Sequence, residues 1–589
     1  MIKLTGKNIT FLQVTLIIIL GVLIYSNCSN GGFIWDDHGL IKDNVYIKNW
    51  SNLPKIIRAD FGAGGGTRSN FYRPLQTIVQ MAGYSLWGTK TTGYHLTSIF
   101  MHILAAIIFY FLLRHIFYDR TISFLASLLF LSFPVNTEAV CYISGLSDPL
   151  VLVFMLACLI FYIKFIFSKR TGTYILALLS FILALFSKEN AVVLPLLILL
   201  YHYAFGKKLE IKKLIPFFVI LIGYILLRLT VLNPLSQSAL AVVDLRGRIP
   251  IFFAGITEYS RLLLLPFNLH VEYVNQLFRF TDVKAVLGLI LTLLLIVFAF
   301  IRRKKNPGVF FAIAWFFITL LPVSNIYPIS YAFIMEHYLY APALGFFIIL
   351  AGLFCHPLKN KIFAFSLRFF IIGLLILYAY LTVKQTEYWK QPVAFYKRTL
   401  EYAPQSWRFY NELGLEYASA GNNLEAEAAY KEALRINPDV VGVYDNLGNL
   451  YRKTNDQKSL REIYKTVNEI NRKLFQHYYA VGRQFKAVGE YAQALGAFKK
   501  ALEFDQNNLI VSSELASTYV LVGRYKDAVN LFKKVLEAKP GFALVYNNLA
   551  VAYYYLKQYD LAVKNCDKAV ALGYPVEPKF INLLKPYKK

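Results

Sequence analysis

Long apolar runs alternate with short polar segments over the first 383 residues. Most runs approach the ~20 residues with which an α-helix crosses the hydrocarbon core of a bilayer. Two runs, 121–135 and 172–187, are short and would need flanking residues or a locally thin membrane. The apolar run at 250–268 is interrupted by Glu258 and Arg261, and we interpret it as re-entrant or interfacial. The remaining pattern predicts eleven membrane-spanning helices, at about 11–26, 95–115, 121–135, 149–167, 172–187, 190–205, 213–231, 284–301, 308–324, 341–356 and 361–383.

A second pattern begins at about residue 405. An apolar residue followed by Gly or Ala recurs every 34 residues, and an aromatic residue lies three places further on, at Tyr417, Tyr451, Phe485, Tyr519 and Tyr553. This period resembles the tetratricopeptide repeat, a helix–turn–helix unit in which small residues let paired helices approach closely. We therefore predict a repeat domain of about five units over 405–589 and a connector helix over 384–404. The second unit departs most, with Leu460 where Ala is expected.

Charge and composition support a membrane protein with one defined orientation. The chain is 57% hydrophobic and 16% charged, which excludes a single water-soluble globule. The net charge of the whole chain is +27, and residues 1–383 contain 32 basic and 14 acidic residues. The basic residues gather in alternate loops, which indicates the cytoplasmic side, whereas the opposite short loops 136–148 and 325–340 have none. No nucleic-acid partner is needed to explain this charge.

This topology predicts a cytoplasmic N-terminus and, after an odd number of spans, a repeat domain on the other side of the membrane. That side would be the periplasm in a bacterium or the lumen of the endoplasmic reticulum in a eukaryote. A long loop at 27–92 follows the first span on the same side. Six of the fourteen acids of 1–383 are expected at this face, namely Asp36, Asp37, Glu138, Asp148, Glu189 and Glu336. Acids at or within a membrane are costly and tend to be functional.

The segment Phe33–His38 has the sharpest chemical signal. It places Asp36 and Asp37 among aromatic residues directly after the first span. Partial burial and a neighbouring like charge raise the pKa of a carboxyl group, so that one of the two could accept a proton from a hydroxyl. The alternative is a loop that simply returns to water. A metal site through Asp36 and His38 lacks a matched set of further ligands.

Cationic residues at the same face could hold a phosphate. Arg73 follows an aromatic residue in the first loop, and an arginine fork binds phosphate oxygens in a bidentate way. Lys188 precedes Glu189 in a short turn, and His337 and Tyr338 follow Glu336 at the start of a span. The alternatives are ordinary snorkelling for Arg73, an ion pair that staples the turn for Lys188 and Glu189, and an interfacial aromatic belt for Tyr338.

The motifs occur in a recognisable order: Trp35-Asp36-Asp37, Tyr72-Arg73-Pro74-Leu75, Gly93-Tyr94-His95-Leu96, Thr137-Glu138-Ala139-Val140, Ser187-Lys188-Glu189, Glu336-His337-Tyr338 and then the repeats. This order resembles the transmembrane and tetratricopeptide-repeat O-mannosyltransferases and their bacterial relatives, which are similar to the wider GT-C glycosyltransferases. The resemblance implies an all-α fold: a polytopic GT-C-like bundle of about 11 spans over 1–383, followed by an α-solenoid. It also implies transfer of a sugar, such as mannose, from a polyprenyl-phosphate carrier to a Ser or Thr hydroxyl of a protein recruited by the repeats.

The resemblance further implies roles for individual residues. Asp36 or Asp37 would activate the acceptor hydroxyl, with inversion at the anomeric carbon, and Glu138 matches the second acid of the family. Arg73, Lys188 and His337 would contact the donor, and Asp148, Glu189, Glu336 and Tyr338 complete the candidate substrate-binding set. The sequence has Leu146 and His337 where family members commonly have Arg, which weakens phosphate contacts from those two loops.

Two further hypotheses stay open at this point. The sugar could pass to a lipid or glycan of the cell envelope, with the repeats assembling a complex, or the protein could be a non-catalytic membrane scaffold or transporter. The expected partners are the bilayer, the polyprenyl-phosphate sugar and a protein or peptide acceptor. No cofactor is firmly implied: cationic groups could stabilise the leaving phosphate, and the chemistry leaves a divalent metal open.

Overall fold

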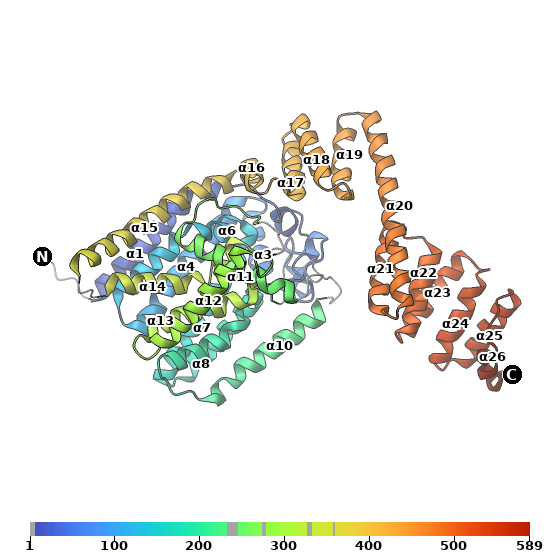
Figure 1. The fold of residues 1–589 in the computed structure, drawn as a ribbon, viewed down its shortest axis with the longest axis horizontal. Helices are drawn as coiled ribbons and strands as arrows, with labels where there is room; N and C mark the ends of the chain where they lie inside the picture. Colours follow the sequence, from blue (N-terminus) through green and yellow to red (C-terminus); the bar gives the residue numbers. More distant parts are fainter. Residues whose placement is uncertain (1–5, 233–244, 274–277, 327–332, 357–359, 589) are drawn as a thin grey trace. The chain divides into compact units, whose positions relative to one another are not determined.

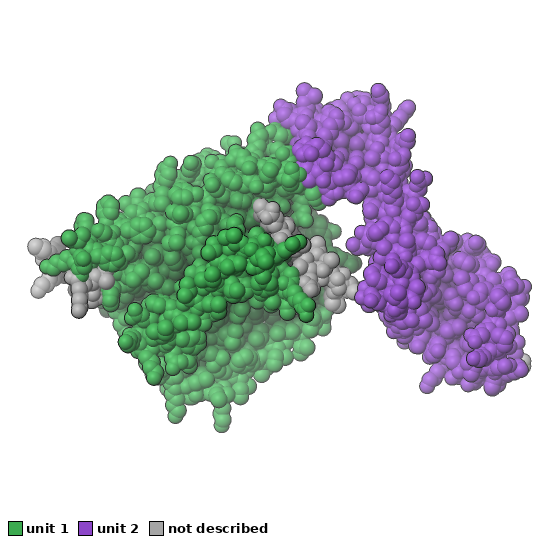
Figure 2. Space-filling model, viewed as in Figure 1, with its two compact units in different colours: residues 1–417 green, residues 418–589 purple. Residues whose placement is uncertain are grey.

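The computed structural model describes residues 6–232, 245–273, 278–326, 333–356 and 360–588 (Figure 1). Across these residues the structure is helical, with turns and loops between the helices and no β-strand. The chain divides into two compact units, residues 1–417 and 418–589 (Figure 2). An all-α architecture was the sequence expectation, and the structure confirms it.

Each of the eleven predicted spans corresponds to helical structure in the described part of the chain. Six segments are long and apolar enough to cross a membrane, and they contain α1 (Gly6–Tyr25), α4 (Thr91–Phe117), α7 (Ser147–Ser168), α10 (Ile215–Val231), α12 (Val283–Arg302) and α15 (Lys361–Lys390). Among the described residues of the first unit, four further apolar helices are shorter: α8 (Thr171–Ser187), α9 (Leu194–Ala204), α13 (Pro307–Leu320) and α14 (Ala343–Cys355). The protein therefore has the helices of a multi-pass membrane protein.

The run at 121–135 forms one arm of a bent pair. Helix α5 (Arg120–Leu131) is followed, after a turn at Pro134–Asn136, by α6 (Thr137–Cys141), and the two directions differ by 53°. Pro134 cannot donate a backbone hydrogen bond and disfavours a continuous helix through this point. The bend brings Glu138, on α6, into the same neighbourhood as the end of the first loop, because α6 packs against α4 and α15.

The run at 250–268 forms α11 (Leu245–Leu264), which packs along α12. Its two charged residues are paired: Arg261 lies 2.6 Å from the Glu258 carboxylate, and Lys284 of α12 lies 3.4 Å from the other Glu258 oxygen. These pairs reduce the cost of charge in an apolar segment. The interfacial or re-entrant placement of this helix stays a prediction.

The loop after the first span is a folded element rather than a flexible linker. It contains α2 (Leu53–Ile57) and α3 (Pro74–Trp87), and its apolar side chains form a small core with residues from α4 and the segment after α6. The buried members of this core are Ile41, Ile47, Ile56, Met81, Tyr94 and Ile143. Because the core fixes both ends of the loop, it also fixes the position of Trp35–His38.

The predicted connector is helical and belongs to the first unit. Helix α15 is followed by α16 (Pro392–Tyr402), with Pro392 at the first turn, where its missing N–H costs nothing. The first repeat helix, α17 (Trp407–Ser419), lies almost entirely within the same unit. Buried Phe395 and Tyr396 of α16 pack against Trp389 and Phe409 on either side. The compact unit thus extends past the predicted domain end at residue 383.

The second unit is a stack of paired helices, as the 34-residue period predicts. It consists of α18 (Asn423–Ile436), α19 (Val441–Lys453), α20 (Gln457–Ala487), α21 (Tyr491–Phe504), α22 (Leu509–Leu521), α23 (Tyr525–Ala538), α24 (Ala543–Tyr555), α25 (Tyr559–Ala571) and α26 (Pro578–Leu584). Several periodic small and aromatic residues from α21 onward, including Ala494, Phe498, Ala528 and Phe532, are buried in one core. The structure confirms that these aromatic residues serve packing.

One helix of the stack departs from the repeat. Helix α20 runs without a break for 31 residues and joins the second helix of one repeat to the first helix of the next (Figure 1). Pro438 and Pro540 lie in the turns that separate other helices, whereas Arg472 occupies the equivalent position inside α20. With no helix breaker at this place, the backbone continues its hydrogen bonding.

Two glycines of the second unit allow a matched test of this packing. In Gly482→Ala, the new Cβ would lie 2.6 Å from the Phe498 ring, and overpacking of this kind costs about 1–3 kcal/mol. In Gly496→Ala, the new Cβ meets no atom within 4 Å, and the change should gain about 0.5–1 kcal/mol from helix propensity. We expect hydrogen exchange of α21 amides in the full-length protein to become faster in the first variant and slower in the second. Shifts in the same direction would contradict the packing described here.

Candidate active site

Asp37 is a buried anchor of the first loop. One carboxylate oxygen accepts hydrogen bonds from the backbone N–H of Ser144, at 2.8 Å, and from its hydroxyl, at 2.6 Å. The other accepts from the Ile34 N–H at 3.1 Å. Burial raises the pKa of Asp37 to about 7, against the lowering effect of these donors. The side chain ties the loop after α1 to the segment between α6 and α7.

Asp36 has a different environment, although it is the next residue. It is exposed to solvent, and its carboxylate is hydrogen-bonded by Tyr142. The surrounding protein raises its pKa by desolvation, and the bond with Tyr142 lowers it. The Tyr142 ring stacks between Trp35 and Trp389, with centroids 6.0 Å from each. Asp36 is therefore the acid of the pair that a substrate can reach, and a rigid aromatic group supports it.

The backbone turns sharply just before Asp36. Trp35 has φ of +55°, a conformation that a bulky residue adopts only where its surroundings enforce it. The Trp35 N–H donates to the Tyr396 hydroxyl at 2.9 Å, and its ring lies 5.5 Å from that of Phe409. The connector helix α16 and the first repeat helix α17 thus hold the conformation of the acidic loop.

Helix α17 adds two acids to the surroundings of Asp36. The His38 Nε2 lies 3.4 Å from a Glu416 oxygen, and this contact raises the pKa of His38. Burial raises the pKa of Glu412 to about 7, and the nearby charge of Asp36 adds to this effect. Sequence reasoning assigned α17 to the repeats and did not predict a place for its side chains beside the membrane domain.

Two of the predicted phosphate-binding cations form buried ion pairs. Arg73 binds Glu189 with two nitrogens, at 2.6 and 3.1 Å. Lys188 lies 2.7 Å from both oxygens of Asp148. The turn is therefore not stapled by a pair between Lys188 and Glu189, since each of them pairs with a different segment. The two pairs join the first loop, the start of α7 and the turn between α8 and α9.

The third predicted cation is also paired. Glu138 accepts the His337 backbone N–H at 2.8 Å, and its other oxygen lies 2.8 Å from His337 Nδ1. Glu336 accepts from the His270 N–H at 2.6 Å and the Tyr273 hydroxyl at 2.8 Å. Burial, aided by the charge of Glu138, raises the pKa of Glu336 well above its usual value. These contacts join α6, the segment before α14 and the segment after α11.

The predicted residues thus come together in one region of the first unit. The Arg73 guanidinium lies 3.4 Å from the Ser147 hydroxyl, next to Asp148. A small pocket connects the Lys188–Asp148 pair with His337. Its lining residues include Asp148, Asn190, Thr319, His337, Tyr338 and Tyr340. Among the residues that the structure describes, no group of three or more His, Cys, Asp or Glu side chains is arranged to hold a metal ion.

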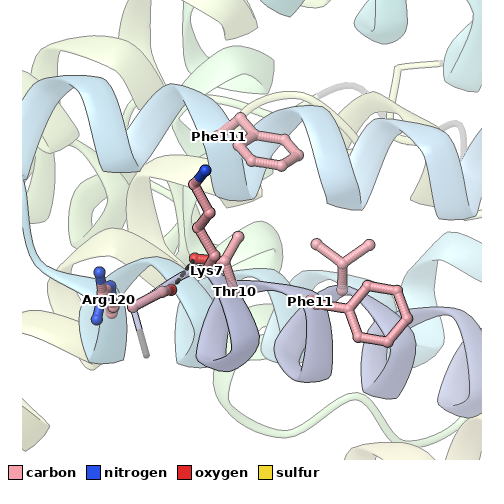
Figure 3. Close-up of a pocket in the computed structure, with 7 residues that line it drawn as sticks. Lys7, Thr10, Phe11, Phe111 and Arg120 are labelled. Carbon is pink, nitrogen blue, oxygen red and sulfur yellow. Dashed lines mark hydrogen bonds between the residues drawn. The ribbon is translucent and has the colours of Figure 1, made fainter. Parts of the chain in front are cut away.

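A separate hollow contains none of these residues. It lies between α1, α4 and α5, and its lining residues include Phe11, Val14 and Phe111 together with Lys7 and Arg120 (Figure 3). The basic residues of this end were predicted to face the cytoplasm. The hollow is therefore distinct from the acid-rich region that contains Asp36.

Sequence reasoning missed several residues that position the candidate acids. Ser144 and Tyr142 bind Asp37 and Asp36, and Tyr396 holds Trp35. Ser144 opens the Ser144–Asp148 segment, whose polar character was visible in the sequence. Tyr396 was visible only as a residue one repeat period before Tyr430, which suggested packing within the repeats.

Comparisons with known proteins divide the chain in the same way. Residues 74–232 match the family model described as dolichyl-phosphate-mannose-protein mannosyltransferase. Residues 408–440 and 513–573 match tetratricopeptide repeat models. The mannosyltransferase match includes Glu138, Asp148, Lys188 and Glu189, and it begins at residue 74, within the first loop but after Asp36.

Curated relatives agree with these matches. The protein O-mannosyl-transferase F38B6.6 of Caenorhabditis elegans is 26% identical over 72% of this chain and 63% of its own length. The mouse protein O-mannosyl-transferase TMTC3 is 33% identical over 27% of this chain and 18% of its own length. This chain thus spans less than two thirds of the length of either relative. Of solved structures, the tetratricopeptide-repeat protein YrrB aligns with 32% of this chain and 97% of its own at 20% identity and a TM-score of 0.19.

The matches bear out the resemblance drawn from the sequence motifs, since they find both parts of the combination in the predicted order. The chain, with a segment that matches a mannosyltransferase family model and with tetratricopeptide repeats, is similar to the protein O-mannosyl-transferases of animals.

Proposed function

We propose that this protein is an integral-membrane mannosyltransferase that transfers mannose from a polyprenyl-phosphate carrier to a Ser or Thr hydroxyl of a protein. The observation that carries the proposal is the position of Asp36. It is a solvent-exposed acid beside a set of buried, ion-paired residues, several of which belong to the mannosyltransferase-family match. A purified preparation that transfers mannose from polyprenyl-phosphate-mannose to protein would test the activity directly.

Asp36 is the better candidate for the general base, and Asp37 is the better candidate for the residue that holds the loop in position. A general base must reach the proton that it accepts, and Asp36 is exposed. Asp37 is buried, and its oxygens are already engaged by Ser144 and Ile34. A substrate hydroxyl could reach Asp37 only after these bonds were broken. The geometry therefore favours a division of roles between the two adjacent acids.

The proposed transfer is a single displacement. Asp36 accepts the proton of the acceptor hydroxyl as its oxygen forms a bond to the anomeric carbon of mannose. The bond between that carbon and the phosphate oxygen breaks, its electron pair stays on the carrier phosphate, and the sugar configuration inverts. The buried pairs Arg73–Glu189 and Lys188–Asp148 supply a rigid polar wall for the donor. The charge pattern of the loops supports an extracytoplasmic site.

The second unit is proposed to recruit the acceptor. Stacked helix pairs of this type form extended surfaces that hold peptide segments. The first repeat helix, α17, already contributes Phe409 and Glu416 to the region around Asp36. This proposal assigns protein, rather than a free glycan or lipid, as the acceptor.

Substitution of Asp36 and of Asp37 by Asn, one at a time, tests the different roles of the two acids. We expect Asp36→Asn to retain the fold and to lose transfer by about 100-fold or more, the scale of a general base. Asp37→Asn should lower the melting temperature, because an amide nitrogen must face a backbone or hydroxyl donor. Purified variants should be assayed for transfer and thermal unfolding together. Full transfer by the Asp36 variant would reject its role as the base.

Tyr142→Phe should change the pH dependence of transfer. The Tyr142 hydroxyl lowers the pKa of Asp36, so its removal should raise that pKa. Because a base must be deprotonated, the acidic limb of the pH–rate profile should move to higher pH. Tyr110→Phe is a matched control, since Tyr110 donates to Gln13 and lies outside the candidate site. Equal profiles for the wild type and Tyr142→Phe would contradict the proposed base.

Deletion of residues 418–589 tests recruitment by the repeats. This boundary keeps α17 residues Phe409 and Glu416, which contact the acidic loop. We expect slow hydrolysis of polyprenyl-phosphate-mannose to continue and transfer to protein to fall. A shorter protein that ends at residue 404 should lose both activities, because it lacks those contacts. Unchanged protein transfer after deletion of 418–589 would reject the recruitment role.

A further inference from the structure

The candidate site described so far lacks an uncompensated positive charge for the phosphate of the donor. When mannose leaves the carrier, the phosphate gains a second negative charge, and catalysis needs preorganised positive groups at that place. The three predicted cations are each engaged with a carboxylate: Arg73 with Glu189, Lys188 with Asp148 and His337 with Glu138. The Arg73–Glu189 and Lys188–Asp148 pairs are close to neutral overall and provide limited stabilisation for added negative charge.

Arg228 is a cation of a different kind. It lies near the end of α10, and its Nη2 donates to the Asn70 carbonyl oxygen at 3.0 Å, which places it beside the Asn70–Arg73 segment. Its Nε is buried and has no hydrogen-bond partner among the described residues. Within the same residues, no carboxylate lies within ion-pair distance of its guanidinium. A buried donor without an acceptor is costly, so a ligand oxygen would suit it.

Tyr224 provides an independent second donor. It lies one helical turn before Arg228, so both side chains share one face of α10. Tyr224 is only 4% exposed, and its hydroxyl also has no partner among the described residues. Its ring lies 6.4 Å from that of Tyr72, and it interacts electrostatically with Arg73, Arg228 and Glu189. Two unsatisfied donors therefore face the segment that carries Arg73.

The rest of α10 is suited to a lipid. Its other faces carry exposed apolar side chains, including Ile222, Ile225 and Leu229. Only two residues of the helix, Phe217 and Tyr224, are fully buried. A prenyl chain could therefore stay in the bilayer along α10 while its phosphate reaches the polar face at the end of the helix.

We propose that Arg228 and Tyr224 form the binding site for the phosphate of the polyprenyl donor, beside the neutral Arg73–Glu189 pair. The guanidinium fork binds two phosphate oxygens, and the phenol donates to one of them. A phosphodiester carries one negative charge, which the single charge of Arg228 matches. As the bond to mannose breaks, the second charge develops on an oxygen within reach of the same donors. This inference rests on the proposed function for the identity of the donor.

Binding of a short-chain polyprenyl phosphate without sugar tests the site apart from turnover. The full-length protein in detergent can be titrated by native mass spectrometry. We expect Arg228→Gln to weaken binding by roughly 10- to 100-fold, the scale of a lost hydrogen-bonded charge. Arg228→Lys should weaken it less, and Tyr224→Phe by several-fold. Arg246→Gln, an exposed arginine at the start of α11, is the matched control and should bind like the wild type.

The same titration distinguishes polyprenyl phosphate from other lipids as the ligand. It also distinguishes failure of the phosphate site from failure of the proposed function. Uncharged polyprenol should bind weakly to every variant, and phosphatidylglycerol should not displace the polyprenyl phosphate. Wild-type affinity in Arg228→Gln, or equal displacement by phosphatidylglycerol, would overturn the inference. If the melting temperature shows that Arg228→Gln does not fold, the affinity of Tyr224→Phe for polyprenyl phosphate provides the test, and wild-type affinity in that variant would overturn the inference. Arg228-dependent binding without any mannose transfer would instead reject the proposed function and leave the phosphate site intact.

Discussion

The candidate site depends on the neutralisation of buried charge at one face of the helical bundle. Five of the acids near this face are almost fully buried: Asp37, Glu138, Asp148, Glu189 and Glu336. Each would be costly alone, and each accepts a hydrogen bond from, or forms an ion pair with, another segment of the chain. The charge pairs therefore act as fixed cross-links between the first loop, α6, α7, the turn after α8 and the segment before α14.

This constraint explains why neighbouring residues have opposite roles. In both adjacent pairs, Asp36 with Asp37 and Lys188 with Glu189, the two side chains engage different partners. Lys188 has an extended backbone, with φ of −160° and ψ of 144°, whereas Asp36 and Asp37 lie in a turn that leads into a helix. In both places the adjacent side chains leave the backbone in different directions, so a short segment can join two elements at once. Asp36 remains at the surface because Asp37 holds the loop in place. A buried anchor beside an exposed acid gives a base whose position is defined before substrate arrives.

The sequence allowed the helices, the repeats and most candidate residues to be predicted, since hydrophobic periodicity and a fixed 34-residue period are local signals. The pairing of the charges was not local. Lys188 and Glu189 looked like a pair because they are adjacent, but their partners, Asp148 and Arg73, are 40 and 116 residues away. The uninterrupted α20 was also missed, because the repeat register continues through Arg472 while the turn does not.

Tyr224 and Arg228 were missed for a related reason. In the sequence they lie within and at the end of an ordinary apolar run, where a tyrosine and an arginine indicate an interfacial anchor. Their significance comes from what surrounds them in three dimensions. Arg228 Nε and the Tyr224 hydroxyl have no acceptor in the described part of the chain, and they lie next to a segment whose own cation, Arg73, is already paired. A site that must bind an anion keeps some positive charge uncompensated. Arg73 and Lys188 are paired with carboxylates, whereas Arg228 has no carboxylate partner among the described residues, so Arg228 is a stronger candidate for the anion site than the cations predicted from motifs.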